Sequence, residues 1–219
     1  MKQHHIELNR LQKILLICGI LSSILYIGTD IIASMFLYPG YSYTSQQVSE
    51  LSAIGAPTKT LWSNMGLIYD ILLVAFAIGV LSVSKKETSL KITAVLILVF
   101  VLETMLWKYA PMHPRGTVSV SADIAHIVLA AVEVLTMVLF MSFGARALGR
   151  KFRIFSGITI FLTLAAGAFV GTTANAIAAG QPTPWMGLVE RVSVYSPMIW
   201  LVVFALVMLQ WKESQVIHT

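Results

Sequence analysis

The chain has 219 residues, of which 57% are hydrophobic and only 11% are charged, and its mean hydropathy is +0.81. A water-soluble domain of this length needs far more polar surface to cover its core, so the composition excludes one and indicates an integral membrane protein. The formal net charge of +5 does not indicate a nucleic-acid partner, because the basic residues are dispersed between long apolar runs. The single cysteine, Cys18, excludes an intrachain disulfide.

Six apolar runs are long enough to cross the hydrocarbon core of a bilayer as helices. The first run continues past the length of a signal peptide and ends without a small-residue cleavage site, so we expect it to be retained. Neither an internal repeat nor an interdomain linker is visible, so residues 1–219 are expected to form one all-α domain, a six-transmembrane-helix bundle. The predicted spans are Leu11–Phe36, Lys59–Val83, Leu90–Ala110, Ser121–Leu148, Phe155–Ala176 and Leu188–Trp211.

The distribution of basic residues predicts the orientation of this bundle. Eleven of the fifteen Lys and Arg residues lie in or next to the terminal segments and the second and fourth connections. Because basic residues are enriched on the cytoplasmic side of a membrane, we expect both termini to be cytoplasmic. Seven of the ten acidic residues then fall within the membrane or on its outer side, which makes the outer half the unusual one.

The connection 37–58 is the only long loop between the predicted spans, and we expect it to be structured. Thr44 and Gln47 have the spacing of a capping box, which predicts the start of a short helix. Val48 and Leu51 would give that helix one apolar edge. It either covers the outer mouth of the bundle or follows the lipid headgroups.

Ionisable residues inside the apolar runs are the main functional signal. In the segment 121–133, Asp123, His126 and Glu133 fall within roughly an 80° arc of one helical face. Charged groups in hydrocarbon are costly and normally turn toward partners, a cavity or a transport pathway. This face is therefore predicted to form one wall of a buried polar site.

Other spans bring polar groups to similar depths. Asp30 lies on a polar stripe of the first span, and Asp70 and Glu103 lie near the membrane midplane, as Glu133 does. Arg191 is expected at the outer surface where the last span begins, as a cation available to the site. The candidate polar or ligand-binding residues are Asp30, Ser49, Glu50, Asp70, Glu103, Asp123, His126, Glu133, Glu190 and Arg191.

Other interpretations of these residues stay open. An ion-paired network could serve only to specify how the helices pack. A bound metal is not expected, because the sequence has neither a His-x-x-x-His pair nor a cysteine ligand near His126, and no cofactor is expected either. A hydrolase would need Ser49 or Ser121 beside His126, but no strained nucleophile turn surrounds either serine. No catalytic residue is assigned.

Three segments carry a family resemblance: YPGYSYTSQQVSELSAIGAPT after the first span, DIAHIVLA in the fourth, and MGLVERVSVYSPMIW opening the sixth. They resemble the domain-of-unknown-function 998 family of prokaryotic multi-pass membrane proteins. The Gly- and Pro-rich connection of that family is only partly matched by Pro111, Pro114 and Gly116. The resemblance implies a location in a prokaryotic cell membrane and an outer-facing site, but no reaction. The positions that it implies are Pro39, Gly40, Ser49, Glu50, Leu51, His126, Glu190, Arg191 and Trp200.

The leading functional hypothesis is an outward-facing polar pocket in the membrane that binds or moves a lipid-like or amphiphilic small molecule. One alternative is an intramembrane enzyme acting on a lipid or isoprenoid, with His126 and Glu190 or Glu133 as acid and base. Another is a non-catalytic subunit that holds a protein partner through Gly167 and Gly171, although such small-residue faces mostly pack helices within one chain. Proton-coupled transport lacks the support of an inverted repeat. The lipid bilayer is the one expected partner, and oligomeric state is left open.

Overall fold

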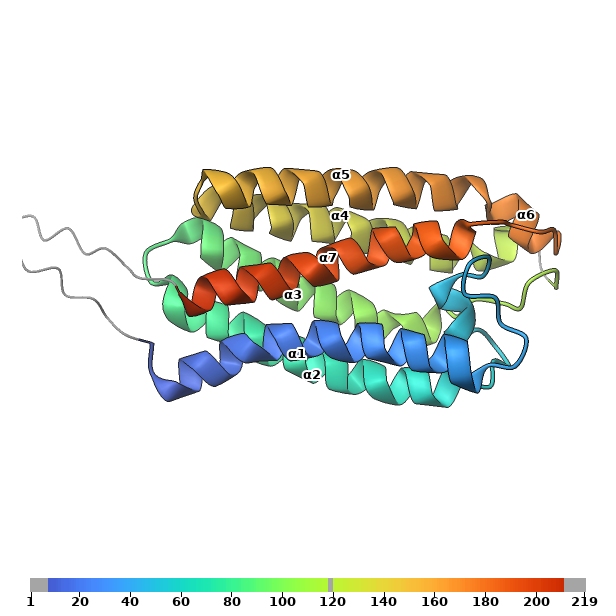
Figure 1. Ribbon diagram of the computed structural model, residues 1–219, viewed down its shortest axis with the longest axis horizontal. Coiled ribbons are helices and arrows are strands. Elements are labelled where there is room, and N and C mark those ends of the chain that lie inside the picture. Colours follow the sequence, from blue (N-terminus) through green and yellow to red (C-terminus); the bar gives the residue numbers. More distant parts are fainter. Residues whose placement is uncertain (1–7, 118–119, 211–219) are drawn as a thin grey trace, which may run out of the picture.

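The computed structural model describes residues 8–117 and 120–210, and this part of the chain contains helices and no strand. Six long helices run side by side along the length of the molecule (Figure 1). All six are long and apolar enough to cross a membrane, which confirms the six-span all-α fold. They are α1 (Arg10–Ile32, continued by a π-helical turn Ala33–Leu37), α2 (Lys59–Ser84), α3 (Thr88–Leu106), α4 (Ile124–Ala147), α5 (Arg150–Thr172) and α7 (Met186–Leu209).

The largest boundary error concerns the fifth span, which begins at Arg150 rather than Phe155 and ends at Thr172 rather than Ala176. Gly149 precedes it in an extended conformation. Long basic side chains can extend along an apolar helix with their charges in water, so the basic first turn does not prevent helix formation. After Thr172 the chain turns into a separate short helix, α6 (Ala174–Ala178).

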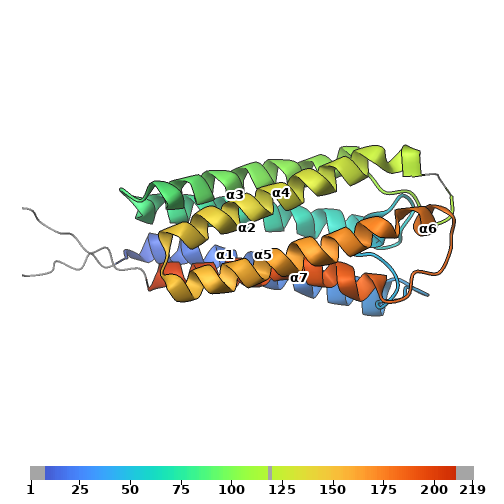
Figure 2. The same cartoon turned by 90° about the horizontal axis from the view of Figure 1, so that it is seen from above.

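The long helices pack as neighbouring pairs, α1 with α2, α3 with α4, and α5 with α7. In Figure 2, α3 and α4 lie along one side of the bundle and α5 and α7 along the other. The start of α1 and the end of α7 share one end of the molecule, which we call the terminal end (Figure 1). The connections that follow α1, α3 and α5 share the opposite end, which we call the loop end.

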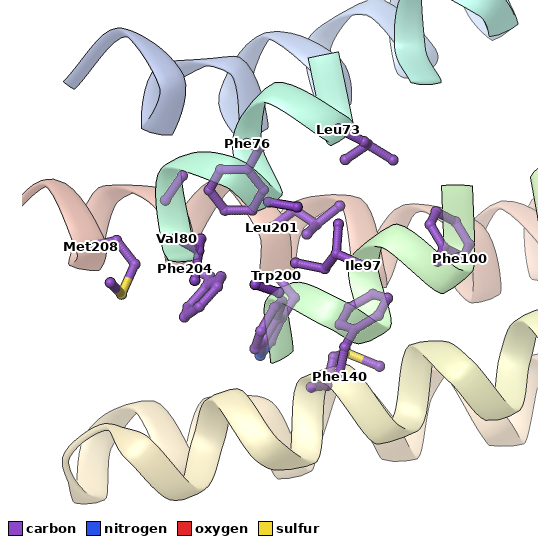
Figure 3. Close-up of a cluster of buried hydrophobic side chains, with 14 of the residues drawn as sticks. Leu73, Phe76, Val80, Ile97, Phe100, Phe140, Trp200, Leu201, Phe204 and Met208 are labelled. Atoms are coloured by element: carbon purple, nitrogen blue, oxygen red, sulfur yellow. The ribbon is translucent and has the colours of Figure 1, made fainter. Parts of the chain in front are cut away.

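The main apolar core fills the terminal half of the bundle (Figure 3). Trp200 of α7 is fully buried and stacks on Phe204, with ring centroids 4.7 Å apart. Its indole Nε1 donates a hydrogen bond of 2.7 Å to Ser156 Oγ on α5. Gly144 of α4 admits this ring, because a Cβ there would lie 2.7 Å from it. Trp200 is thus a residue of the apolar core.

The connection after α1 folds onto the loop end. Its short 3-10 helix, Val48–Ser52, buries Val48 and Leu51 against the bundle, where they pack with Ala33. The capping box joins Gln47 and Glu50 rather than Thr44 and Gln47. The predicted pair is wrong because the helix begins one turn later. The segment therefore covers the loop end of the bundle.

Candidate functional site

An ion pair between α1 and α7 lies buried beneath the loop end. Arg191 Nε donates to Asp30 Oδ2 at 2.7 Å, and a terminal guanidinium nitrogen donates to Asp30 Oδ1 at 2.8 Å. The Tyr195 hydroxyl, one helical turn from Arg191, also donates to Asp30 Oδ2. Asp30 is 0% and Arg191 3% exposed, so the guanidinium of Arg191 lies beneath the connection after α1 rather than in contact with solvent.

The other donors of Arg191 hold the connection after α1. Hydrogen bonds run to the carbonyl oxygens of Tyr43 at 2.8 Å and Gly187 at 3.1 Å, and to the Tyr41 hydroxyl at 3.1 Å. The guanidinium also lies 3.7 Å from the centre of the Tyr43 ring. Burial raises the pKa of the Tyr41 hydroxyl, which keeps it neutral beside this cation. Arg191 therefore has no donor left for a ligand and acts as a structural clamp.

A second ion pair joins all three connections of the loop end. Glu50 of the 3-10 helix accepts a bond of 2.7 Å from Arg115, which follows α3. Arg115 also donates to Thr183 Oγ1 at 2.9 Å and to the Gln181 carbonyl oxygen at 3.1 Å, both of which precede α7. The sequence reading missed this role of Arg115. The sequence feature that could have indicated this role is Glu50. A carboxylate in a short helix that packs on the bundle needs a cation as its partner.

Two candidates next to the 3-10 helix also make structural contacts. A carboxylate oxygen of Glu190 accepts a hydrogen bond from the backbone N–H of Val48, at the start of that helix. Ser49 Oγ lies 3.3 Å from Met112 Sδ. Among the residues that the structure describes, no histidine contacts the Ser49 hydroxyl, so this serine has no base to activate it.

Near the middle of the bundle, two carboxyl groups bond to hydroxyls of neighbouring helices. Asp70 of α2 accepts from Thr104 Oγ1 on α3 at 2.6 Å, and Glu103 of α3 accepts from Thr136 Oγ1 on α4 at 2.8 Å. Both carboxyl side chains are buried. The second oxygen of Glu103, Oε2, is buried without a hydrogen-bond partner in the described part of the chain.

Trp107 links two of the predicted residues on α4. Its indole Nε1 donates to Glu133 Oε1 at 2.7 Å, and its ring lies against the His126 imidazole with centroids 4.6 Å apart. His126 Nδ1 is 3.0 Å from the Ala110 carbonyl oxygen. His126 and Glu133 therefore lie on one face of α4, as predicted.

Asp123 lies just before the α-helix that carries these two residues. It ends a 3-10 helix, Val120–Asp123, and α4 begins only at Ile124. Its carboxylate lies 2.9 Å from His113 Nδ1 and accepts from the His113 backbone N–H at 3.1 Å. The α-helix thus begins three residues later than the predicted Ser121, and Asp123 and His126 both bond to the connection that precedes it.

Tyr26 of α1 lies where the loop-end and midplane groups come closest. Its ring packs against Tyr69 of α2, with centroids 5.4 Å apart. Its hydroxyl is within electrostatic range of Asp30, Glu133 and Glu190. No described residue makes a hydrogen bond to this hydroxyl. We call the polar and aromatic residues between the loop end and the main core the polar layer: Tyr26, Trp107, His126, Glu133 and Glu190.

The polar layer separates the main core from two small apolar clusters under the loops. No residue of α4 from Ile124 to Val132 is buried, whereas the rest of the helix buries Met137, Phe140 and Met141. Tyr26, His126 and Glu190 stay partly accessible. The loop-side turns of α4 are thus less covered by the rest of the protein than the remainder of the helix.

Other features of the described residues lie away from this layer. Surface depressions of about 480 and 570 Å³ open at the loop end, and no residue of the polar layer lines either one. Within residues 8–117 and 120–210, no group of three or more His, Cys, Asp or Glu side chains is placed to hold a metal ion.

Comparison with known proteins identifies a family but no activity. A family model described as "Protein of unknown function (DUF998)" matches residues 20–207. The match includes every residue of the polar layer and both ion pairs. No curated protein and no solved structure matches the chain.

Proposed function

The chain belongs to the DUF998 family of uncharacterised proteins, and for this multi-pass member we propose that it binds or moves an amphiphilic, lipid-like small molecule. The ligand's polar end would reach the polar layer while its apolar part lies along α4. The observation that carries this proposal is the change in burial along α4 at the depth of that layer. There the apolar core stops, and α4 buries no residue between Ile124 and Val132.

The route to this site would run through the membrane rather than from water. The 3-10 helix and the two ion pairs cover the loop end, with Leu51 and Arg191 both buried. Along α4, in contrast, Ile124, Ile127 and Val128 are exposed apolar residues. An alkyl chain can lie on such a surface without leaving an apolar environment.

The polar groups that remain accessible are better suited to binding a ligand than to catalysing a reaction. Arg191 and Asp30 use their hydrogen-bonding capacity on each other and on the loop. Ser49 has no base among the described residues. What remains is a set of acceptors and aromatic edges on several helices, which is typical of sites that orient a ligand.

Photocrosslinking tests the proposal. The purified protein in maltoside detergent is labelled with a non-ionic amphiphile that carries a diazirine in its alkyl chain, and the modified peptides are mapped by mass spectrometry. We expect saturable labelling of the segment 124–133 that excess unlabelled amphiphile removes.

A matched pair of variants separates the site from the lipid-facing surface. Ala130 lies on the face of α4 that carries His126 and Glu133, and Ala131, next to it, is exposed. Ala130→Trp should lower the labelling of 124–133 about tenfold by filling the space, whereas Ala131→Trp should leave it unchanged. Unsaturable labelling, equal in both variants, would refute the binding site.

A further inference from the structure

We propose that the ligand's polar end is a cation, of the class of organic ammonium groups attached to an apolar chain. This inference rests on the proposed function and adds the charge of the ligand. It follows from the balance of acidic and basic groups around the polar layer, from one unpartnered buried oxygen, and from the aromatic rings that accompany them.

Acidic groups around the polar layer outnumber the basic groups free to neutralise them. Arg191 is paired with Asp30 and Arg115 with Glu50. Lys108 is exposed and lies over the Tyr109 ring, 4.8 Å from its centre. In the described part of the chain, no Lys or Arg forms an ion pair with the carboxyl groups that remain, which are Asp70, Glu103, Glu133 and Glu190.

The free oxygen of Glu103 is a second and independent observation. Glu103 is only 7% exposed, and its Oε2 has no hydrogen-bond partner among the described residues. Glu103 and Asp70 both lie within electrostatic range of Glu133, so this oxygen belongs to the same group of acids. An unpaired buried acceptor is costly, and a cationic N–H donor satisfies both its charge and its hydrogen bond.

Aromatic rings complete the chemistry of a site for organic cations. Trp107 donates to Glu133, and the hydroxyls of Tyr26 and Tyr69 lie within electrostatic range of the same carboxyl group. Proteins bind alkylammonium groups by placing them against aromatic faces beside a negative charge. An anionic headgroup would instead find carboxyl groups and no free guanidinium beside them.

Competition against the photocrosslinking amphiphile tests this assignment. The competitors share a hexadecyl chain and differ only in headgroup: a primary ammonium, maltoside and sulfate, each in non-ionic detergent. We expect the ammonium compound to halve the labelling of 124–133 at a concentration about tenfold lower than the maltoside requires. The sulfate should compete least.

Variants identify the group responsible for the preference. Glu133→Gln keeps an acceptor for Trp107 and removes the ionisable carboxyl group that would pair with a cation, so it should abolish most of the ammonium preference. Glu87→Gln, which neutralises an exposed carboxylate in the turn before α3, should not change it.

The outcomes separate this inference from the proposed function. Equal competition by all three headgroups, or strongest competition by the sulfate, would refute the cationic headgroup while leaving amphiphile binding intact. Failure of every competitor to reduce the labelling would refute both. A preference for ammonium that persists in Glu133→Gln would exclude the acidic group as its cause.

Discussion

Asp30 and Arg191 are 161 positions apart in the chain, yet each is the main bonding partner of the other. Removing two charges from water costs several kcal/mol per ion, and the pair recovers this cost through two parallel bonds and the further hydrogen bonds of Tyr195 and Tyr43. Because every N–H donor of Arg191 is already used, the two side chains stabilise the protein only when both are present.

Loss of one partner should therefore be costly. We expect Asp30→Asn to lower the free energy of unfolding by about 3–5 kcal/mol, because it leaves a buried guanidinium without its counter-ion. Tyr195→Phe, which removes one hydrogen bond, should cost about 1 kcal/mol. Thermal unfolding in maltoside detergent, followed by size-exclusion chromatography of the heated samples, measures both changes.

A double variant provides the control for that prediction. Asp30→Asn combined with Arg191→Gln removes both charges, so it should be less destabilising than the sum of the two single changes. If the destabilisation of the double variant equals the sum of the two single changes, the ion pair does not act as a unit.

At the scale of elements, the start of α7 meets the connection after α1 without an intervening side chain. A Cβ on Gly187 would overlap the carbonyl oxygens of Gln46 and Tyr43, and Tyr43 is also a partner of Arg191. The loop can pack this closely only because residue 187 is glycine. Gly171, near the end of α5, has no atom within 4 Å of the same position.

These two glycines give opposite predictions for the same substitution. Gly187→Ala should destabilise the protein by about 1–3 kcal/mol, because the loop must move away from α7. Gly171→Ala should be neutral or stabilise by up to about 1 kcal/mol, since alanine favours the helix. Limited proteolysis of the connection after α1 should accelerate in Gly187→Ala only. Equal protease resistance in both variants would contradict the close packing.

The elements also show which features could be predicted from sequence. Hydropathy and length place the spans to within a few residues, because the bilayer sets both. The polar stripe through Ser23 and Asp30 is likewise confirmed, since helical periodicity alone determines it.

Contacts between side chains of different helices and loops could not be predicted from the sequence. The bond from Trp107 to Glu133 depends on how α3 and α4 are rotated about their axes, which periodicity does not fix. Burial of Arg191 depends on a loop that folds back over it. The direction in which the Asp123 side chain points depends on where α4 begins. Its hydrogen bond to His113 is an alternative to helical backbone geometry at this position. Small-residue spacing in α5 did identify a close contact, as Gly167 lies against Ser193 of α7.

For the whole molecule, the two ion pairs increase the difference in positive charge between its two ends that the sequence indicates. The loop end holds four basic residues, of which Arg115 and Arg191 are neutralised by Glu50 and Asp30. Lys59 and Lys108 are then its remaining described cations outside these pairs. At the terminal end the described basic residues are Arg10, Lys13, Lys85, Lys86, Lys91, Arg146, Arg150, Lys151 and Arg153.

This asymmetry predicts that the terminal end is cytoplasmic and the loop end faces outward. Single-cysteine labelling in intact cells tests it, starting from Cys18→Ala, which removes the native thiol. Gln181→Cys, in the exposed connection before α7, should react with a membrane-impermeant maleimide. Lys86→Cys, exposed in the turn between α2 and α3, should react only after the cells are permeabilised. The reverse pattern would place the polar layer in the inner half of the membrane, and the amphiphile would then be taken from the inner leaflet.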